Sequence, residues 1–120
     1  MESTPVPSPD GNVRCTVLAR LGEPSVITVS GDADLHSIGP VGEAVRTALD
    51  HHPHLVFDLG GVAFADSSFL NVLLQARNTS LERGGSVRLL RASSQVRRLL
   101  DLTGAGTLFP ATTDEQLKQP

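Results

Sequence analysis

An aspartate followed by two serines is the part of this sequence whose residue types and spacing best suit a chemical role. Asp66, Ser67 and Ser68 lie between an apolar run and a stretch with helical spacing, so we expect them in a short loop that opens a helix. Ser67 suits the N-cap position, where its hydroxyl would accept hydrogen bonds from backbone N–H groups. Ser68 would then project from the first turn, where a kinase has access to its hydroxyl.

Phosphorylation at this position would change the surface more than the fold. A phosphoserine adds about −1.5 to −2 charges at neutral pH, and the partial positive charge of a helix N-terminus tolerates them. Asp66 already makes the surface acidic, and Asp32 and Asp34 add to it if their strand ends beside this loop. The phosphate would then repel a docked partner. The commoner explanation of such a triplet is a helix start that is never modified.

The elements around the triplet predict an α/β domain. Two β-branched runs, residues 15–20 and 25–30, flank Gly22, Glu23 and Pro24 and predict a hairpin. Apolar residues at helical spacing predict a helix ending near Asp50, a second from residue 66 to about 83 and a third over 95–103, capped by Ser93 or Ser94. The apolar runs 54–59 and 86–90 predict strands, the first of them covered on both faces.

Shorter signals complete the expected order of elements. Gly60 and Gly61 should break the strand before them, and residues 108–110 are expected as a short edge strand. Thr113 and Gln116 predict a capping box that starts a last helical turn. Strands that alternate with helices after an opening hairpin imply one domain with a mixed, mostly parallel sheet and helices packed on it.

Composition narrows the classes of partner. The 120 residues suit one domain, and we expect residues 1–12 to be a disordered tail and 13–120 to be the domain. Aromatic residues make up only 3% and the net charge is −3, which disfavours direct nucleic-acid binding. A single cysteine, Cys15, excludes an internal disulfide. The sequence has no signal peptide and no run of 18 apolar residues, so a cytoplasmic protein without membrane contact is expected.

Other chemistries fit the sequence less well. Asp58 follows a buried strand, like the phosphoacceptor of a receiver domain, but the acidic pair and the lysine of that site lack matching positions. His51 and His52 are adjacent and cannot share a helix face, so no metal site is expected. The serine pair lacks the glycines of a nucleophile elbow. We therefore expect no catalytic residue, cofactor or metal.

From about Arg14 to Leu117, the sequence resembles STAS domains, specifically the bacterial anti-sigma-factor antagonists. The resemblance is carried by the Gly31-Asp32-Ala33-Asp34 turn and by LVFDLGGVAFADSSFLNVLL. In that family a phosphorylatable serine stands second in the motif Asp-Ser-Ser-Gly-Leu, which implies Ser68 here. It further implies an anti-sigma-factor partner with serine kinase activity, a serine phosphatase that resets the cycle, and indirect regulation of transcription. The residues expected at the partner surface are Asp32, Asp34, Asp66, Ser67, Ser68, Phe69 and Asn71.

Phe69 stands where the family motif has glycine. Its ring would either pack on the core with Val72 and Leu73, as helical spacing permits, or alter docking and phosphorylation at the surface. A STAS scaffold that is never phosphorylated is therefore one alternative, and a receiver-like domain phosphorylated on Asp58 is a second. Monomer and homodimer both stay open.

Overall fold

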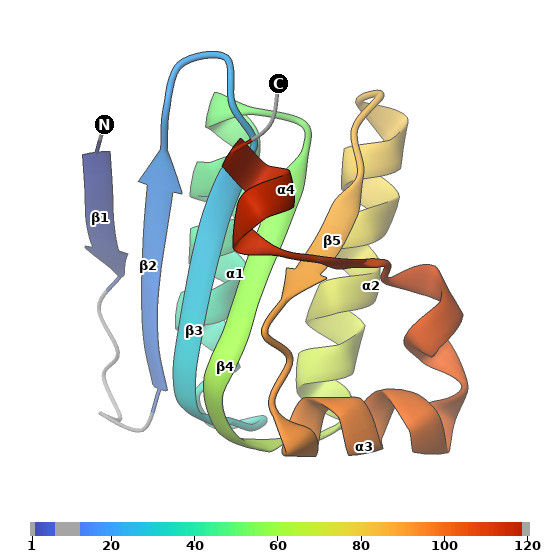
Figure 1. Cartoon of the computed structure of the whole chain (residues 1–120). Helices are drawn as coiled ribbons and strands as arrows, with labels where there is room; N and C mark the ends of the chain where they lie inside the picture. Colours follow the sequence, from blue (N-terminus) through green and yellow to red (C-terminus); the bar gives the residue numbers. More distant parts are fainter. Residues whose placement is uncertain (1, 7–12, 119–120) are drawn as a thin grey trace.

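Apolar residues alternate with polar ones along the first long strands, and this pattern builds a mixed six-stranded sheet (Figure 1). The computed structural model describes residues 2–6 and 13–118. The strands lie in the order β1 (Glu2–Val6), β2 (Val13–Ala19), β3 (Ser25–Ala33), β4 (Leu55–Ala65), β5 (Val87–Leu90) and β6 (Ala111–Thr112). Strands β1 to β3 pair antiparallel and β3 to β6 pair parallel, which confirms the expected mixed, mostly parallel sheet.

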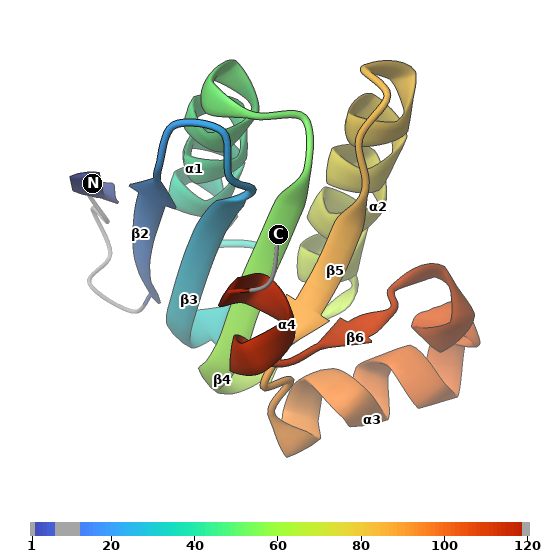
Figure 2. The same ribbon diagram turned by 45° about the horizontal axis from the view of Figure 1, so that its top comes forward.

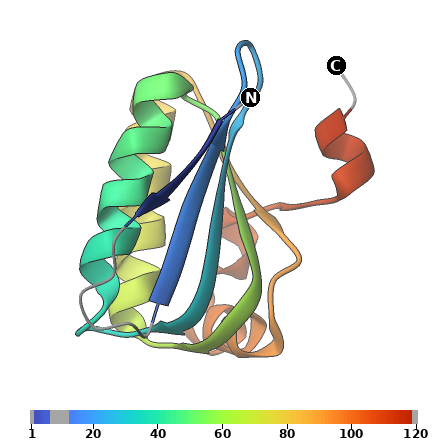
Figure 3. The same cartoon turned by 90° about the vertical axis from the view of Figure 1, so that its left-hand side faces the viewer.

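The two longest helices cover one face of the sheet, and we call the opposite face the open face. Figure 3 shows α1 (Ile38–His51) and α2 (Ser67–Glu82) side by side on one face. On the opposite face stands α4 (Asp114–Lys118), while α3 (Ser94–Thr103) and the 3-10 turn η1 (Ala105–Leu108) lie at one end of the molecule (Figure 2). The core between the covered face and the helices is mainly aliphatic, with Phe57 and Phe69 as its largest fully buried side chains.

The N-terminal residues correct one expectation. Glu2–Val6 form strand β1, paired antiparallel with β2, where the composition predicts a disordered tail. The strand lies at the edge of the sheet, where a proline such as Pro5 is tolerated because one side of the strand needs no ladder partner. The remainder of the predicted tail, residue 1 and residues 7–12, lies outside the described residues.

Two further boundaries differ from the prediction. Strand β4 continues through Gly60 and Gly61 to Ala65 because it keeps pairing with β3, with register shifts between Thr28 and Ser30 and between Gly31 and Asp32. A Cβ on Gly61 would lie 2.8 Å from Ser30 Cβ, so glycine permits the close approach of the strands there. The last strand is Ala111–Thr112 rather than residues 108–110, because the chain first turns through η1.

Two caps follow the sequence closely. The Ser93 hydroxyl accepts from Val96 N at 3.3 Å and caps α3. The capping box of α4 is confirmed: Gln116 N donates to Thr113 Oγ1 at 3.2 Å, and Thr113 N donates to Gln116 Oε1 at 3.1 Å. Among the described helices, none is long and apolar enough to cross a bilayer.

Candidate functional site

The predicted site residues come together where two parallel strands end. Strands β3 and β4 pair up to their last residues, with Asp32 opposite Phe64 and Ala33 opposite Ala65. The chain then enters two loops at the same edge of the sheet, one leading to α1 and one to α2 (Figure 1). Asp66 Oδ2 accepts a hydrogen bond from Leu35 N at 3.2 Å and joins these loops. The expected proximity of the two acidic segments is therefore confirmed. We call residues 32–37 and 64–69 the switch corner.

Asp66, rather than Ser67, caps α2. Asp66 has an extended backbone, and its Oδ1 accepts from Ser68 N at 2.9 Å and from Phe69 N at 3.4 Å. Ser67 is the first residue of the helix and its side chain is exposed. The prediction of Ser67 as the N-cap is therefore wrong by one residue, because aspartate and serine are about equally good N-caps and their types do not distinguish them. The shift by one residue moves Ser68 deeper into the first turn.

Ser68 is half-buried and its hydroxyl is not used to hold the loop. Its backbone N–H donates to the Asp66 carboxylate, but within the described part of the chain its hydroxyl makes no hydrogen bond. The hydroxyl lies within the first turn of α2, where the helix dipole favours negative charge. The first turn of α2 contains no acidic residue. A phosphate attached there would therefore meet a helix end that tolerates it.

Asp34 organises the second loop of the corner. Its Oδ1 accepts from Ser37 Oγ at 2.7 Å, from Ser37 N at 3.1 Å and from His36 N at 3.1 Å. These bonds, above all the one from the Ser37 hydroxyl, lower the pKa of Asp34 below its ordinary value of 3.8. The half-buried Asp32 contributes its backbone carbonyl, which lies 2.8 Å from Ser37 Oγ. Both aspartates thus border the surface, while Asp34 also fixes the shape of the loop.

Phe69 does not lie at the surface. Its side chain is 0% exposed and belongs to the same core cluster as Leu73 and Ala76, with Val72 packed against it. Core packing, one of the two expected roles of this ring, is therefore confirmed, and its place in the predicted partner surface is wrong. The reason is helical geometry, since residue 69 lies on the inward stripe of α2. Asn71, by contrast, is exposed as expected.

Two exposed apolar side chains belong to the switch corner. Leu35 is 66% exposed and Phe64 is 46% exposed, and their backbones adjoin Asp66 and Asp32 respectively. Large exposed apolar groups beside a polar centre are typical of protein-binding surfaces. Phe64 was missed as a site residue because the register shifts beside it break the period of two that normally separates buried from exposed positions.

The competing candidates have structural roles. Asp58 Oδ2 accepts from Arg91 at 2.7 Å and Asp58 Oδ1 accepts from Gly60 N at 3.3 Å, so this carboxylate is held in an ion pair. His52 Nδ1 accepts from His54 N, and His54 Nδ1 lies 2.8 Å from Ser86 Oγ, which fixes the turn before β4. Over residues 2–6 and 13–118, no group of three or more His, Cys, Asp or Glu is placed to hold a metal ion.

The switch corner therefore combines a serine hydroxyl that has no hydrogen-bond partner among residues 2–6 and 13–118, nearby carboxylates and exposed apolar side chains. The carboxylates of Asp66 and Asp34 accept bonds from backbone groups, and these bonds preorganise the surface. Such an arrangement suits the binding of a protein and the covalent modification of a hydroxyl.

Comparison with known proteins gives a consistent picture. The family model described as "Mlab, STAS domain" matches residues 16–110. An anti-sigma F factor antagonist from Paenibacillus polymyxa is 28% identical over 92 residues, which are 75% of this chain and 79% of that protein. The crystal structure of an anti-sigma factor antagonist from Mycobacterium paratuberculosis has a TM-score of 0.76 at 29% identity, covering 92% of this chain and 94% of that one. Unphosphorylated SpoIIAA, described as an anti-sigma factor antagonist, is similar in fold, with a TM-score of 0.72 at 22% identity over 84% of this chain and 90% of its own.

Proposed function

The chain belongs to the STAS domain family, and from this premise we propose that it is an anti-sigma-factor antagonist whose binding is controlled by phosphorylation of Ser68. The unphosphorylated form binds an anti-sigma factor and so releases a sigma factor. A serine kinase activity of the anti-sigma factor phosphorylates Ser68 and ends the binding, and a phosphatase restores it. The cycle would take place in the cytoplasm, and the chain would serve as a substrate rather than as an enzyme.

The observation that carries this proposal is the position of the Ser68 hydroxyl. It lies in the first turn of α2, makes no hydrogen bond within the described residues and adjoins a corner built by two strands. Relatives at 28% and 29% identity are named as anti-sigma-factor antagonists. A structure similar in fold, that of SpoIIAA, is also known in a phosphorylated form.

The electrostatics of the corner explain how a phosphate would end binding. Asp66 caps the same helix turn, and the loop joined to it carries Asp32 and Asp34. If a phosphate costs the interface ~3 to 4 kcal/mol of repulsion and desolvation, affinity falls by a factor of hundreds. The partner surface would comprise Asp32, Asp34, Asp66, Ser67, Ser68 and Asn71, together with the exposed side chains of Leu35 and Phe64.

The test compares the two adjacent serines, which are matched controls for each other. The anti-sigma factor is first captured from the source cell with the wild-type chain, identified and purified, and binding is then titrated by calorimetry. We expect Ser68→Ala to keep the wild-type affinity and Ser68→Asp to lose roughly tenfold or more, because one carboxylate carries about half the charge of a phosphate. Ser67→Asp should lose less, since residue 67 points into solvent at the start of the helix. Equal affinities for Ser68→Asp and Ser68→Ala would contradict the proposal.

A phosphorylation assay decides between this proposal and a STAS scaffold that is never modified. The scaffold alternative rests on Phe69 in place of the motif glycine, but the buried position of its ring removes the bulk from the surface around Ser68. After incubation with the purified anti-sigma factor and ATP, intact mass should show one phosphate on the wild-type chain and on Ser67→Ala, and none on Ser68→Ala. A wild-type chain that gains no phosphate would favour the scaffold. The receiver-like alternative has no support, because Asp58 is engaged by Arg91 in a STAS chain.

A further inference from the structure

The open face of the sheet changes character along its length. Outward-facing residues of β2 and β3 are polar at one end, as the opposed pair Arg14 and Ser30 shows, whereas Leu18 and Val26 near the hairpin are half-buried apolar side chains. A sheet face that is to be fully solvated would carry polar residues throughout. The apolar end is therefore the part of this face that requires cover.

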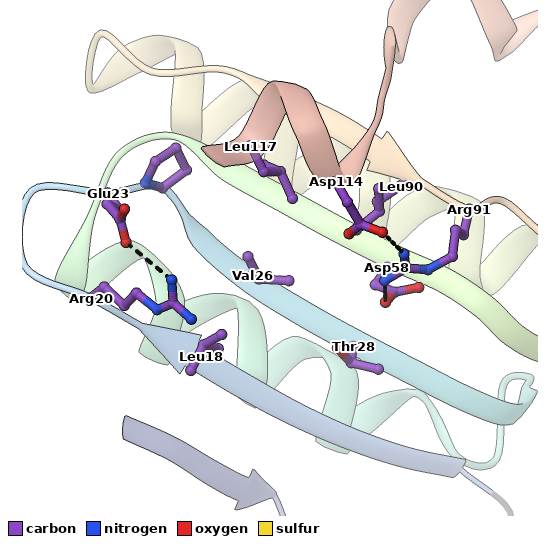
Figure 4. A pocket seen from close by; sticks show the side chains of 11 residues that line it. Leu18, Arg20, Glu23, Val26, Thr28, Asp58, Leu90, Arg91, Asp114 and Leu117 are labelled. Atoms are coloured by element: carbon purple, nitrogen blue, oxygen red, sulfur yellow. Dashed lines mark hydrogen bonds and ion pairs between the residues drawn. The ribbon is translucent and has the colours of Figure 1, made fainter. Parts of the chain in front are cut away.

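That apolar end forms the floor of a cavity. The cavity measures about 320 Å³, and its apolar lining comes from the hairpin strands, from β5 and from α4 (Figure 4). A volume of this order is at the lower end of the range for small-molecule sites. It is too small for a folded protein element. The apolar lining residues are Leu18, Pro24, Val26, Leu90 and Leu117.

Helix α4 covers this cavity with little to hold it. Within the part of the chain that the structure describes, an ion pair joins the Asp114 carboxylate of α4 to the guanidinium of Arg91, the residue that follows β5. Both partners are more than half exposed. At the start of α4, Gln116 Oε1 accepts from Thr112 Oγ1, in strand β6, and from Thr113 N, so this end of the helix is anchored to the edge of the sheet. Exposed ion pairs contribute little to stability, so beyond this anchor α4 is held only weakly over the cavity, as a lid would be.

The charges at the wall of the cavity indicate the class of ligand. Arg91 donates to Asp58 and to Asp114 at once, and Arg20 is paired with Glu23 at 3.7 Å. The guanidinium groups in the lining are therefore compensated by carboxylates of the same lining. The lining holds two arginines and three carboxylates, so an anionic ligand would find no uncompensated positive charge there and would be repelled by the excess carboxylate. An apolar molecule needs only the existing floor.

We propose that this cavity is a binding site for a small uncharged apolar molecule, with α4 as its lid. The site lies on the face of the sheet opposite α1 and α2 (Figure 3), and it uses none of the switch-corner residues. It is thus independent of the proposed phosphorylation, and either proposal can fail without the other.

Two dyes that share one aromatic skeleton provide the test. N-phenyl-1-naphthylamine is uncharged, and 1-anilinonaphthalene-8-sulfonate adds a sulfonate to the same skeleton. We expect saturable fluorescence enhancement with the uncharged dye and about tenfold or more weaker binding of the sulfonate, because its charge would be buried unpaired. Val26→Trp, which fills the floor, should abolish binding. Arg14→Trp, on the same open face but outside the cavity lining, should leave it unchanged.

If Val26→Trp does not fold, methyl NMR of the wild-type chain can still locate where the uncharged dye binds. The uncharged dye should shift the methyl resonances of Leu18, Val26 and Leu117 and leave those of Val45 and Leu49 in place. The last two line a groove of similar size between α1 and α2. Shifts confined to that groove, undiminished binding by folded Val26→Trp, tighter binding of the sulfonate, or no saturable binding of the uncharged dye would each overturn the proposal.

Discussion

Aspartates organise two distant regions of this molecule in different ways. In the switch corner, Asp34 and Asp66 accept hydrogen bonds mostly from backbone N–H groups of their own loops. Below α4, Asp58 and Asp114 instead accept from the exposed guanidinium of Arg91. Backbone donors are fixed by the fold, whereas an exposed ion pair is screened by salt and must order a long side chain. The backbone-held contacts therefore keep the first region in one shape, whereas the ion pairs of Arg91 add little to the stability of the second.

The largest expected effect concerns the packing under the switch corner. Phe69→Ala removes a fully buried ring and should destabilise the chain by ~3 to 5 kcal/mol, since a cavity replaces core contacts. Phe64→Ala is the matched control, because this ring is 46% exposed and lies in the same corner. Urea unfolding followed by circular dichroism measures both. If Phe69→Ala and Phe64→Ala lower the free energy of unfolding equally, the burial of Phe69 does not support the switch corner.

A smaller effect should separate the two kinds of aspartate directly. Asp66→Ala removes the N-cap of α2 and the bond to Leu35 N, and should cost about 1 to 2 kcal/mol. Asp114→Ala removes an exposed ion pair and should cost less. Urea unfolding at low and high salt tests the distinction. The loss from Asp66→Ala should persist at high salt, and the loss from Asp114→Ala should fade. An equal salt response of the two variants would remove the contrast between the regions.

The sequence predicted the order of strands and helices from Val13 onward well, because hydrophobic periodicity and cap residues are local signals. The capping box of Thr113 and Gln116 is one example. Boundaries that depend on a neighbouring strand were not predictable in the same way. Gly60 and Gly61 indicate a strand end when viewed alone, but β3 supplies partners that carry β4 past them. Similarly, β1 exists only because the edge of β2 is available for pairing.

The sequence predicted most residues of the candidate site, but it did not predict which of their side chains are exposed. The sequence indicated that Asp66 and the acidic turn would meet if β3 ended beside the loop, and parallel pairing of β3 with β4 fulfils that condition. The exposure of Phe64 was not predictable, because it follows register shifts that only the paired strands define. The prediction of Ser67 as the cap missed Asp66 for a similar reason, since both side chains accept N–H bonds well and only the folded backbone distinguishes them.

The smallest expected effect is a pH dependence of the fold's stability that arises from Asp34 in the switch corner. Its pKa is lowered below 3.8, first by the Ser37 hydroxyl. A carboxylate with a lowered pKa stabilises the fold above its unfolded-state pKa, and this contribution is lost as pH falls through the folded pKa. Asp34→Ala should therefore be less stable than wild type above pH 3.8, with a gap that narrows as the pH falls below 3.8 and through the lowered pKa of the folded state. Ser37→Ala should return the pKa of Asp34 toward 3.8, measurable by NMR titration of its carboxyl carbon. A stability gap that stays constant with pH would mean that the loop does not depend on the charge of Asp34, and the contrast with the ion-paired region would then rest on Asp66 alone.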